Sequence, residues 1–303
     1  MAHDHGSEIK NYNRSFAIGI ALNIIFVVIE ATYGLVADSL ALIADAGHNL
    51  SDVVSLMLAW GAFYLAKKKP TLQRTYGLRK ITILASLTSA ILLLIALGAI
   101  AWEAIGRFSN PQAVDGMTVI IVAAIGVVIN TATALLFIEG QKDDLNIRGA
   151  YLHMAADAGV SVGVVIAGII IMYTGWLWLD PALSILIVLV ILIGTWGLLR
   201  DSVNLAMDAV PREINIEAVK EYLLHLQNIE EIHALHVWAL STTEVALTVH
   251  LVSSSEQIDN KFLDEIQDHL HDTYKIEHAT IQVEYATDSY ECDLNKVTFK
   301  RSL

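Results

Sequence analysis

The chain has 303 residues, of which 55% are hydrophobic and only 17% are charged, against about 25% charged residues in an ordinary globular domain. Its net charge of −13 excludes a general nucleic-acid-binding surface, because phosphate backbones are bound through Lys and Arg. From Val210 onward there are 7 Lys and Arg against 17 Asp and Glu, a net charge of −10. We therefore expect an integral membrane region followed by a soluble acidic domain. The only cysteine, Cys292, excludes an intrachain disulfide or a cysteine-based zinc site.

Six apolar stretches are long enough to span a bilayer, which takes about 20 residues per helix. They run from Phe16 to Val36, Leu40 to Ala66, Leu78 to Ile105, Met117 to Ile138, Ala150 to Tyr173 and Leu179 to Leu199. The first stretch is too long for the core of a signal peptide, so we expect it to be a retained helix. The pattern predicts an N-terminal tail over residues 1–14 and a six-helix transmembrane domain over residues 15–208.

Basic residues in the short connections predict the orientation of these helices, because Lys and Arg concentrate in cytoplasmic loops. The connection from Lys67 to Lys80 contains six Lys and Arg and falls on the same side as Arg14. Only Arg107 falls on the opposite side. Both termini are therefore expected in the cytoplasm.

Two histidines within the apolar stretches are each followed by an aspartate four residues later: His48 by Asp52, and His153 by Asp157. Each pair lies on one face of its helix, and an Asp at membrane depth costs about 2.5 kcal/mol or more. The second and fifth helices run antiparallel. A rise of about 1.5 Å per residue therefore places His48 at the height of Asp157, and Asp52 at the height of His153. We call these four residues the quartet.

Two imidazole nitrogens and two carboxylates form a tetrahedral ligand set that suits Zn²⁺ or a similar divalent metal. Protons compete with the metal at such a site, because the metal requires neutral His and ionised Asp. The quartet therefore predicts a proton-coupled metal antiporter. A proton-independent divalent metal channel or uptake carrier is the alternative function, and His–Asp pairs that only tie helices together are the structural alternative.

An intramembrane hydrolase, and hence an enzyme, is disfavoured by the same residues. The chain has no His-Glu-x-x-His motif, and four protein ligands leave a tetrahedral metal no open position for water. Asp45 and Asn49 lie within one turn of His48 and are candidates for hydrogen bonds that orient the quartet. Polar side chains at such positions also hold membrane helices together, which is the alternative.

The region after the last apolar stretch predicts a small α+β domain over residues 209–286 with the order αββαβ, followed by a flexible tail over residues 287–303. The expected elements are a helix from Ile216 to Leu226, strands from Ile232 to Leu240 and Val245 to Val252, a helix from Gln257 to Tyr274 and a strand from Ala279 to Tyr285. His233 and His250 fall on the two hairpin strands, and Glu284 falls on the last strand. These residues could form a second metal site, or the histidines could have an ordinary structural role.

The run from Ala44 to Asp52, the motif His153-Met154-Ala155-Ala156-Asp157 and six helices ahead of a ferredoxin-like domain together resemble the cation diffusion facilitator family, in particular its bacterial zinc/cadmium/cobalt-resistance branch. The resemblance implies a homodimer in the bacterial inner membrane. It also implies alternating-access export of Zn²⁺, and of Cd²⁺ or Co²⁺, in exchange for protons. The choice among these metals, Mn²⁺ and Fe²⁺ stays open.

The resemblance also assigns roles to individual residues. It places the transport ligands on the quartet, and a cytoplasmic metal site on His233, His250, Gln282 and Glu284. Gln282 replaces a histidine that is common in the family, and His278 is the candidate to compensate. The family's ion pair between helix three and the end of helix six falls on Lys80 and Asp208, although sequence alone favours two separate interfacial charges.

Two further expectations concern segments near the membrane. The connection from Lys67 to Thr75 contains neither His nor Asp, so we expect no metal site in it. His3 and His5 are candidates for a metal-collecting arm, with a solvated tail as the alternative.

Overall fold

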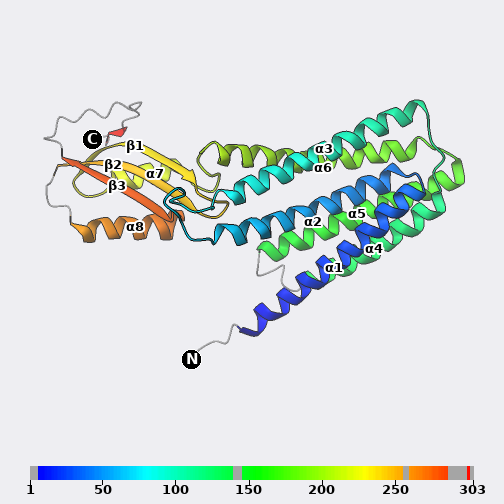
Figure 1. The fold of residues 1–303 in the computed structure, drawn as a ribbon, viewed down its shortest axis with the longest axis horizontal. Coiled ribbons are helices and arrows are strands. Elements are labelled where there is room, and N and C mark those ends of the chain that lie inside the picture. The colour runs from blue at the N-terminus through cyan, green and yellow to red at the C-terminus, as the bar shows by residue number, and fades with distance from the viewer. Residues whose placement is uncertain (1–5, 139–144, 255–258, 286–298, 301–303) are drawn as a thin grey trace. The chain divides into compact units, whose positions relative to one another are not determined.

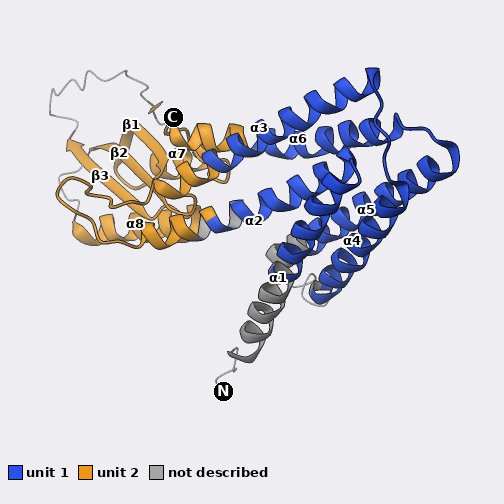
Figure 2. Cartoon of the chain, turned by 45° about the vertical axis from the view of Figure 1, so that its right-hand side comes forward, with its two compact units in different colours: residues 1–57, 88–197 blue, residues 58–87, 198–303 orange. Residues whose placement is uncertain are grey.

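The computed structural model describes residues 6–138, 145–254, 259–285 and 299–300, with the backbone alone at 6–20, 55, 56, 59, 60, 137, 145–150 and 300. His3, His5 and most of residues 287–303 lie outside the described residues. The chain forms two compact units (Figure 2). The first unit comprises residues 1–57 and 88–197, and the second comprises residues 58–87 and 198–303.

Six long helices form the chain up to Ala206, as the sequence predicts (Figure 1). They are α1 (Gly6–Val36), α2 (Leu40–Ala66), α3 (Ile81–Ser109), α4 (Gly116–Phe137), α5 (Leu145–Thr174) and α6 (Leu179–Ala206). Within the described residues, four segments are long and apolar enough to cross a membrane, in α3, α4, α5 and α6, and a shorter apolar segment covers Ala21–Val36. Helix α1 begins at Gly6, inside the stretch expected to be a tail.

Small residues allow close contacts among the helices of the first unit. Gly126 of α4 lies against the Phe26 ring of α1, where an added Cβ would come 2.5 Å from the ring. Gly168 of α5 faces Ile120 of α4 in the same way, at 2.9 Å. Without strong hydrophobic attraction between helices in lipid, such close packing is a main source of helix association.

The start of α2 is fixed by Asp180, which belongs to α6. The Asp180 carboxylate accepts hydrogen bonds from the Ser39 hydroxyl at 2.5 Å and from the backbone N–H groups of Leu40 and Ala41 at 2.9 and 3.3 Å. The first N–H groups of a helix have no partner within the helix, so this carboxylate satisfies them from another element. Asp180 is buried, and it joins the beginnings of two membrane helices.

The C-terminal domain, which we define as α7 through β4, lies within the second unit. It contains α7 (Ile216–Leu224), β1 (Ile229–Ala239), β2 (Val245–Ser253), α8 (Asn260–Tyr274), β3 (His278–Tyr285) and β4 (Phe299–Lys300). The sheet order is β3-β2-β1-β4, with β2 and β3 parallel and the other pairs antiparallel. The predicted αββαβ order is confirmed, and the short strand β4 adds to it a pairing that the sequence did not predict.

Alternation along the strands separates a core face from an open face. Val219 of α7 and Leu270 of α8 pack with Leu247, Val249 and Leu251 of β2 in one buried cluster. His250 lies between two of these buried residues, so it points to the opposite face of the sheet. The open face is therefore where the polar strand residues gather.

A bulge in β1 changes which residues of the strand point toward the core face of the sheet. Ala234 has a positive φ of 51°, and the pairing with β2 shifts register between His233 and His236. The extra residue reverses the alternation, so Ile232 and Val237 are both buried in the core. His233 stays opposite His250 in the register.

Candidate metal centre

The structure brings the quartet together between α2 and α5 of the first unit. His48 Nε2 lies 3.5 Å from Asp157 Oδ1, and His153 Nε2 lies 3.0 Å from Asp52 Oδ2. Within each helix, the i,i+4 distances are 3.8 Å for His48–Asp52 and 3.6 Å for His153–Asp157. The antiparallel heights expected from the sequence correspond to the two contacts between the helices.

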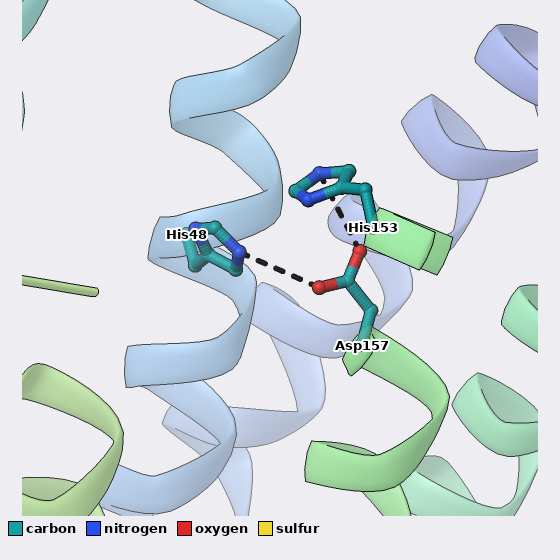
Figure 3. A group of neighbouring side chains, drawn as sticks. All are labelled: His48, His153 and Asp157. Atoms are coloured by element: carbon teal, nitrogen blue, oxygen red, sulfur yellow. Dashed lines mark ion pairs between the residues drawn. The ribbon is translucent and has the colours of Figure 1, made fainter. Parts of the chain in front are cut away.

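Figure 3 shows three members of the quartet, His48, His153 and Asp157, with the Asp157 carboxylate between the two imidazoles. One ligand atom each from His48, His153 and Asp157 lie within 4.8 Å of one another. The Asp52 carboxylate reaches the Nε2 atoms of both histidines. Two nitrogens and carboxylate oxygens at this spacing can close around one small divalent cation with modest side-chain movement.

Exposure changes with depth along the quartet. The side chains of His153 and Asp52 are 40% and 35% exposed, whereas those of His48 and Asp157 are 19% and 4% exposed. The exposed pair lies toward the C-terminal end of α2 and the N-terminal end of α5. The exposure of the quartet therefore increases toward these two helix ends.

Asp45 and Asn49 are buried beside the quartet but contact other residues. The Ser161 hydroxyl donates to Asp45 at 3.3 Å, and the Asn49 amide donates to Glu30 of α1 at 3.3 Å. Neither contact reaches a quartet side chain directly. Within the described residues, Asp45 and Asn49 therefore link α2 to α5 and α1.

Glu30 is a functional candidate that the sequence analysis missed. It is fully buried, and the membrane helices place it with Asp45 and Asn49 next to the quartet. The sequence does single out this residue, because Glu30 is the only charged residue between Phe16 and Val36. An isolated acid in an apolar span is a functional candidate by default.

A second cluster lies on the open face of the C-terminal domain. His250 Nδ1 lies 2.7 Å from Glu284 Oε1, and His233 Nε2 lies 3.1 Å from Glu284 Oε2. One ligand atom from each of these residues lies within 4.8 Å of the others, so the donors fit a Zn²⁺ ion. Burial alone would raise the pKa of the Glu284 carboxyl, but hydrogen bonds from both histidines bring it below its ordinary value. We call these three residues the cytoplasmic cluster.

The two other candidates for this cluster have different positions. Gln282 is exposed, and its amide N–H donates to Glu284 Oε1 at 3.0 Å. In this arrangement Gln282 helps to hold the Glu284 carboxylate in place. His278, the candidate to compensate for Gln282, begins β3 and has its Nε2 2.8 Å from Arg79 Nη1. It lies outside the cytoplasmic cluster because five residues of strand separate it from Glu284.

Two ion pairs occur within the second unit between the start of α3 and later residues. Lys80 Nζ lies 2.6 Å from Asp208 Oδ1, and both side chains are about half exposed. Arg79 Nη1 lies 2.7 Å from Glu244 Oε2. Exposed ion pairs of this kind contribute about 0–1 kcal/mol each to folding stability. Their main effect is therefore to position the residues just before α3.

A helical membrane domain with a His and Asp site, followed by an α+β domain with a second such cluster, defines a membrane protein that handles metal cations. Family models agree with this class. The cation efflux transmembrane domain matches residues 16–205, and the cation efflux protein cytoplasmic domain matches residues 211–286. The chain therefore belongs to the cation efflux family, which is the cation diffusion facilitator family that its sequence motifs resemble.

Curated relatives cover nearly the whole chain. The cation efflux system protein CzcD of Alcaligenes sp. is 37% identical over 94% of this chain and 90% of that protein. The zinc transporter ZitB of Escherichia coli is 36% identical over 98% of this chain and 97% of its own length. The cadmium, cobalt and zinc/H(+)-K(+) antiporter of Bacillus velezensis is 34% identical over 96% of this chain and 94% of its own length. These relatives are transporters, and the chain is not an enzyme.

One solved structure is also similar, the metal-bound C-terminal domain of the CzcD transporter from Cupriavidus metallidurans. It is 32% identical, covers 23% of this chain and 99% of that chain, and has a TM-score of 0.22.

Proposed function

We propose that this protein exports Zn²⁺ from the bacterial cytoplasm in exchange for protons, with the quartet as the transport site. Cd²⁺ and Co²⁺ are further candidate substrates. The observation that carries the proposal is the convergence of His48, Asp52, His153 and Asp157 on two antiparallel membrane helices. Nitrogen ligands disfavour Mg²⁺, and the two carboxylates supply the charge that a divalent cation needs.

Proton coupling follows from the chemistry of these ligands. A proton on either histidine removes the lone pair that the metal uses, so metal and protons exclude each other at the quartet. The name of the Bacillus velezensis relative, which includes H(+), supports this exchange.

The exposure of the quartet favours loading from the cytoplasm. Its more exposed pair, Asp52 and His153, lies toward the ends of α2 and α5 that the basic connections place in the cytoplasm. We infer a cycle of alternating access in an inner-membrane homodimer with both termini in the cytoplasm. The name of the matched C-terminal model, ZT_dimer, supports the dimer.

Zinc uptake into proteoliposomes tests the coupling. We expect uptake to be several-fold faster with an acidic lumen than without a pH gradient, because protons leaving the lumen exchange for entering metal. The control is the same gradient collapsed with a protonophore. Uptake that ignores the gradient would instead establish the alternative, a proton-independent channel or uptake carrier.

We further propose that the cytoplasmic cluster binds Zn²⁺ through His233, His250 and Glu284, with Gln282 holding the carboxylate. Replacing Glu284 by Gln removes the negative charge between the two histidines, so we expect zinc affinity to fall about tenfold or more. The measurement is calorimetric zinc titration of the full-length protein carrying Asp157→Asn, which disables the quartet. Glu265→Gln is the matched control, since Glu265 lies on the same domain and pairs only with Lys261 among the described residues. Equal affinities for the two variants would place the zinc elsewhere.

A further inference from the structure

A group of lysines between α2 and α3 carries positive charge that no acidic side chain of the described residues pairs with. Residues 67–80 contain six Lys and Arg in a chain whose net charge is −13. Arg79 and Lys80 have acidic partners, as described above. Among the described residues, no carboxylate lies within ion-pair distance of Lys67, Lys68 or Lys69, and Lys67 Nζ lies over the Phe63 ring at 4.3 Å.

These three lysines line a cavity of about 590 Å³ inside the second unit. Its walls come from the end of α2, the start of α3 and the turn between β1 and β2. We call it the basic cavity. Its charged lining consists of Lys67, Lys68, Lys69 and Arg79 against Glu244, a net charge of +3. Its uncharged polar lining consists of Thr82, Ser86, Ser241, Thr242 and Thr243.

Hydrogen bonds hold the walls of the basic cavity in place. The backbone N–H of Thr242 donates to the Thr82 hydroxyl at 3.1 Å, which joins the β1–β2 turn to α3. The Ser241 hydroxyl accepts from the N–H groups of Thr243 and Glu244 at 3.1 and 3.0 Å. Arg79 is held by Glu244, so the lysines are the free cations of the described lining.

The position of the basic cavity indicates the source of its ligand. Helix α2 ends at Ala66 and α3 begins at Ile81, so the cavity lies where two membrane helices leave the apolar layer. Phe63, Ala66 and Tyr76 add an apolar wall beside the cations and hydroxyls. A free inorganic anion has no apolar part that could pack against this wall. A phospholipid presents a phosphate for the cations and a glycerol–acyl region for the apolar wall. Basic pockets between membrane helices on the cytoplasmic side suit anionic headgroups.

We propose that the basic cavity binds the phosphate headgroup of an anionic phospholipid from the cytoplasmic leaflet. Lys67, Lys68 and Lys69 pair with the phosphate, the serine and threonine hydroxyls donate to its oxygens, and Phe63 contacts the glycerol region. One lipid then touches both membrane helices and the β1–β2 turn of the C-terminal domain. No quartet residue lines the cavity, so this site is separate from metal binding.

Native mass spectrometry of the full-length protein in detergent tests the proposal with phosphatidylglycerol as the probe and phosphatidylcholine as the uncharged comparison. We expect tighter binding of phosphatidylglycerol to the unmodified protein. The triple variant Lys67→Gln, Lys68→Gln, Lys69→Gln should lose about 100-fold in affinity, since each lysine contributes about fivefold. The variant Lys220→Gln, Lys261→Gln, Lys275→Gln removes the same charge from the C-terminal domain outside the cavity and should bind as the unmodified protein does.

Three results would overturn the proposal. They are equal binding of the two lipids, equal loss in the two triple variants, and displacement of phosphatidylglycerol by millimolar inorganic phosphate, which would indicate a small-anion site. Circular dichroism of both variants checks that the helices are intact. The result is independent of transport, because lipid binding is measured without metal or a proton gradient.

Discussion

Replacing Asp157 by Asn should abolish zinc transport, with a loss of about 100-fold or more in the initial rate of uptake into proteoliposomes. Asp157 is the least exposed member of the quartet and contacts both histidines. An amide of the same shape keeps the packing between α2 and α5. It removes the negative charge that pairs with the cation, and amide groups are poor zinc ligands compared with carboxylates.

The control for this variant is Leu152→Ala on the same helix. Leu152 adjoins His153 in sequence but is exposed, so its truncation should leave uptake nearly unchanged. Equal helicity of the two proteins by circular dichroism separates a lost ligand from a lost fold. If Asp157→Asn kept most of its uptake, the quartet would be a structural contact between helices and the metal path would lie elsewhere.

Replacing Asp180 by Ala should destabilise the membrane domain more than other changes at helix ends. The substitution leaves the Ser39 hydroxyl and two backbone N–H groups of α2 without their acceptor inside the protein. A buried donor without a partner costs about 1–3 kcal/mol, so about 3 kcal/mol or more is expected for the set. The measurement is the midpoint of thermal unfolding in detergent, which should fall by several degrees.

Asp115→Ala is the matched control for Asp180→Ala. Asp115 also caps a membrane helix, α4, but it is exposed, and among the described residues its carboxylate accepts hydrogen bonds only from the first turn of α4. Water can replace it, so its loss should cost about 1 kcal/mol. Equal midpoints for the two variants would mean that the contact between α6 and α2 contributes little beyond an ordinary cap.

Periodicity and charge were enough to predict the membrane helices and the heights of the quartet residues. A span needs a run of apolar residues, and a helix rises by a fixed amount per residue, so both follow from local sequence. The β-rich run from Val245 to Val252 likewise predicted a strand that contains His250. The αββαβ order followed because each element carries its own periodicity and turn residues.

Contacts between distant segments were not predictable in the same way. Asp180 follows its partner Ser39 by 141 residues, and nothing near either residue indicates the other. The bulge at Ala234 needs a backbone conformation that alanine rarely adopts, so the residue type gave no signal. The place of His278 beside Arg79 depends on how the start of β3 meets the start of α3 within the second unit.

The pairing of each His with an Asp on the opposite helix also fixes the lengthwise register of α2 and α5. His48 meets Asp157, and Asp52 meets His153, so each imidazole faces a carboxylate. If α5 slid along α2 by one turn, about 5.4 Å, the overlapping residues would face their own kind, Asp52 against Asp157 or His48 against His153. Two carboxylates in contact repel each other, and two imidazoles in contact lose their acidic partners on the opposite helix. Lengthwise sliding is therefore penalised in both directions, so in the proposed transport cycle we expect the helices to tilt, which leaves the pairs matched.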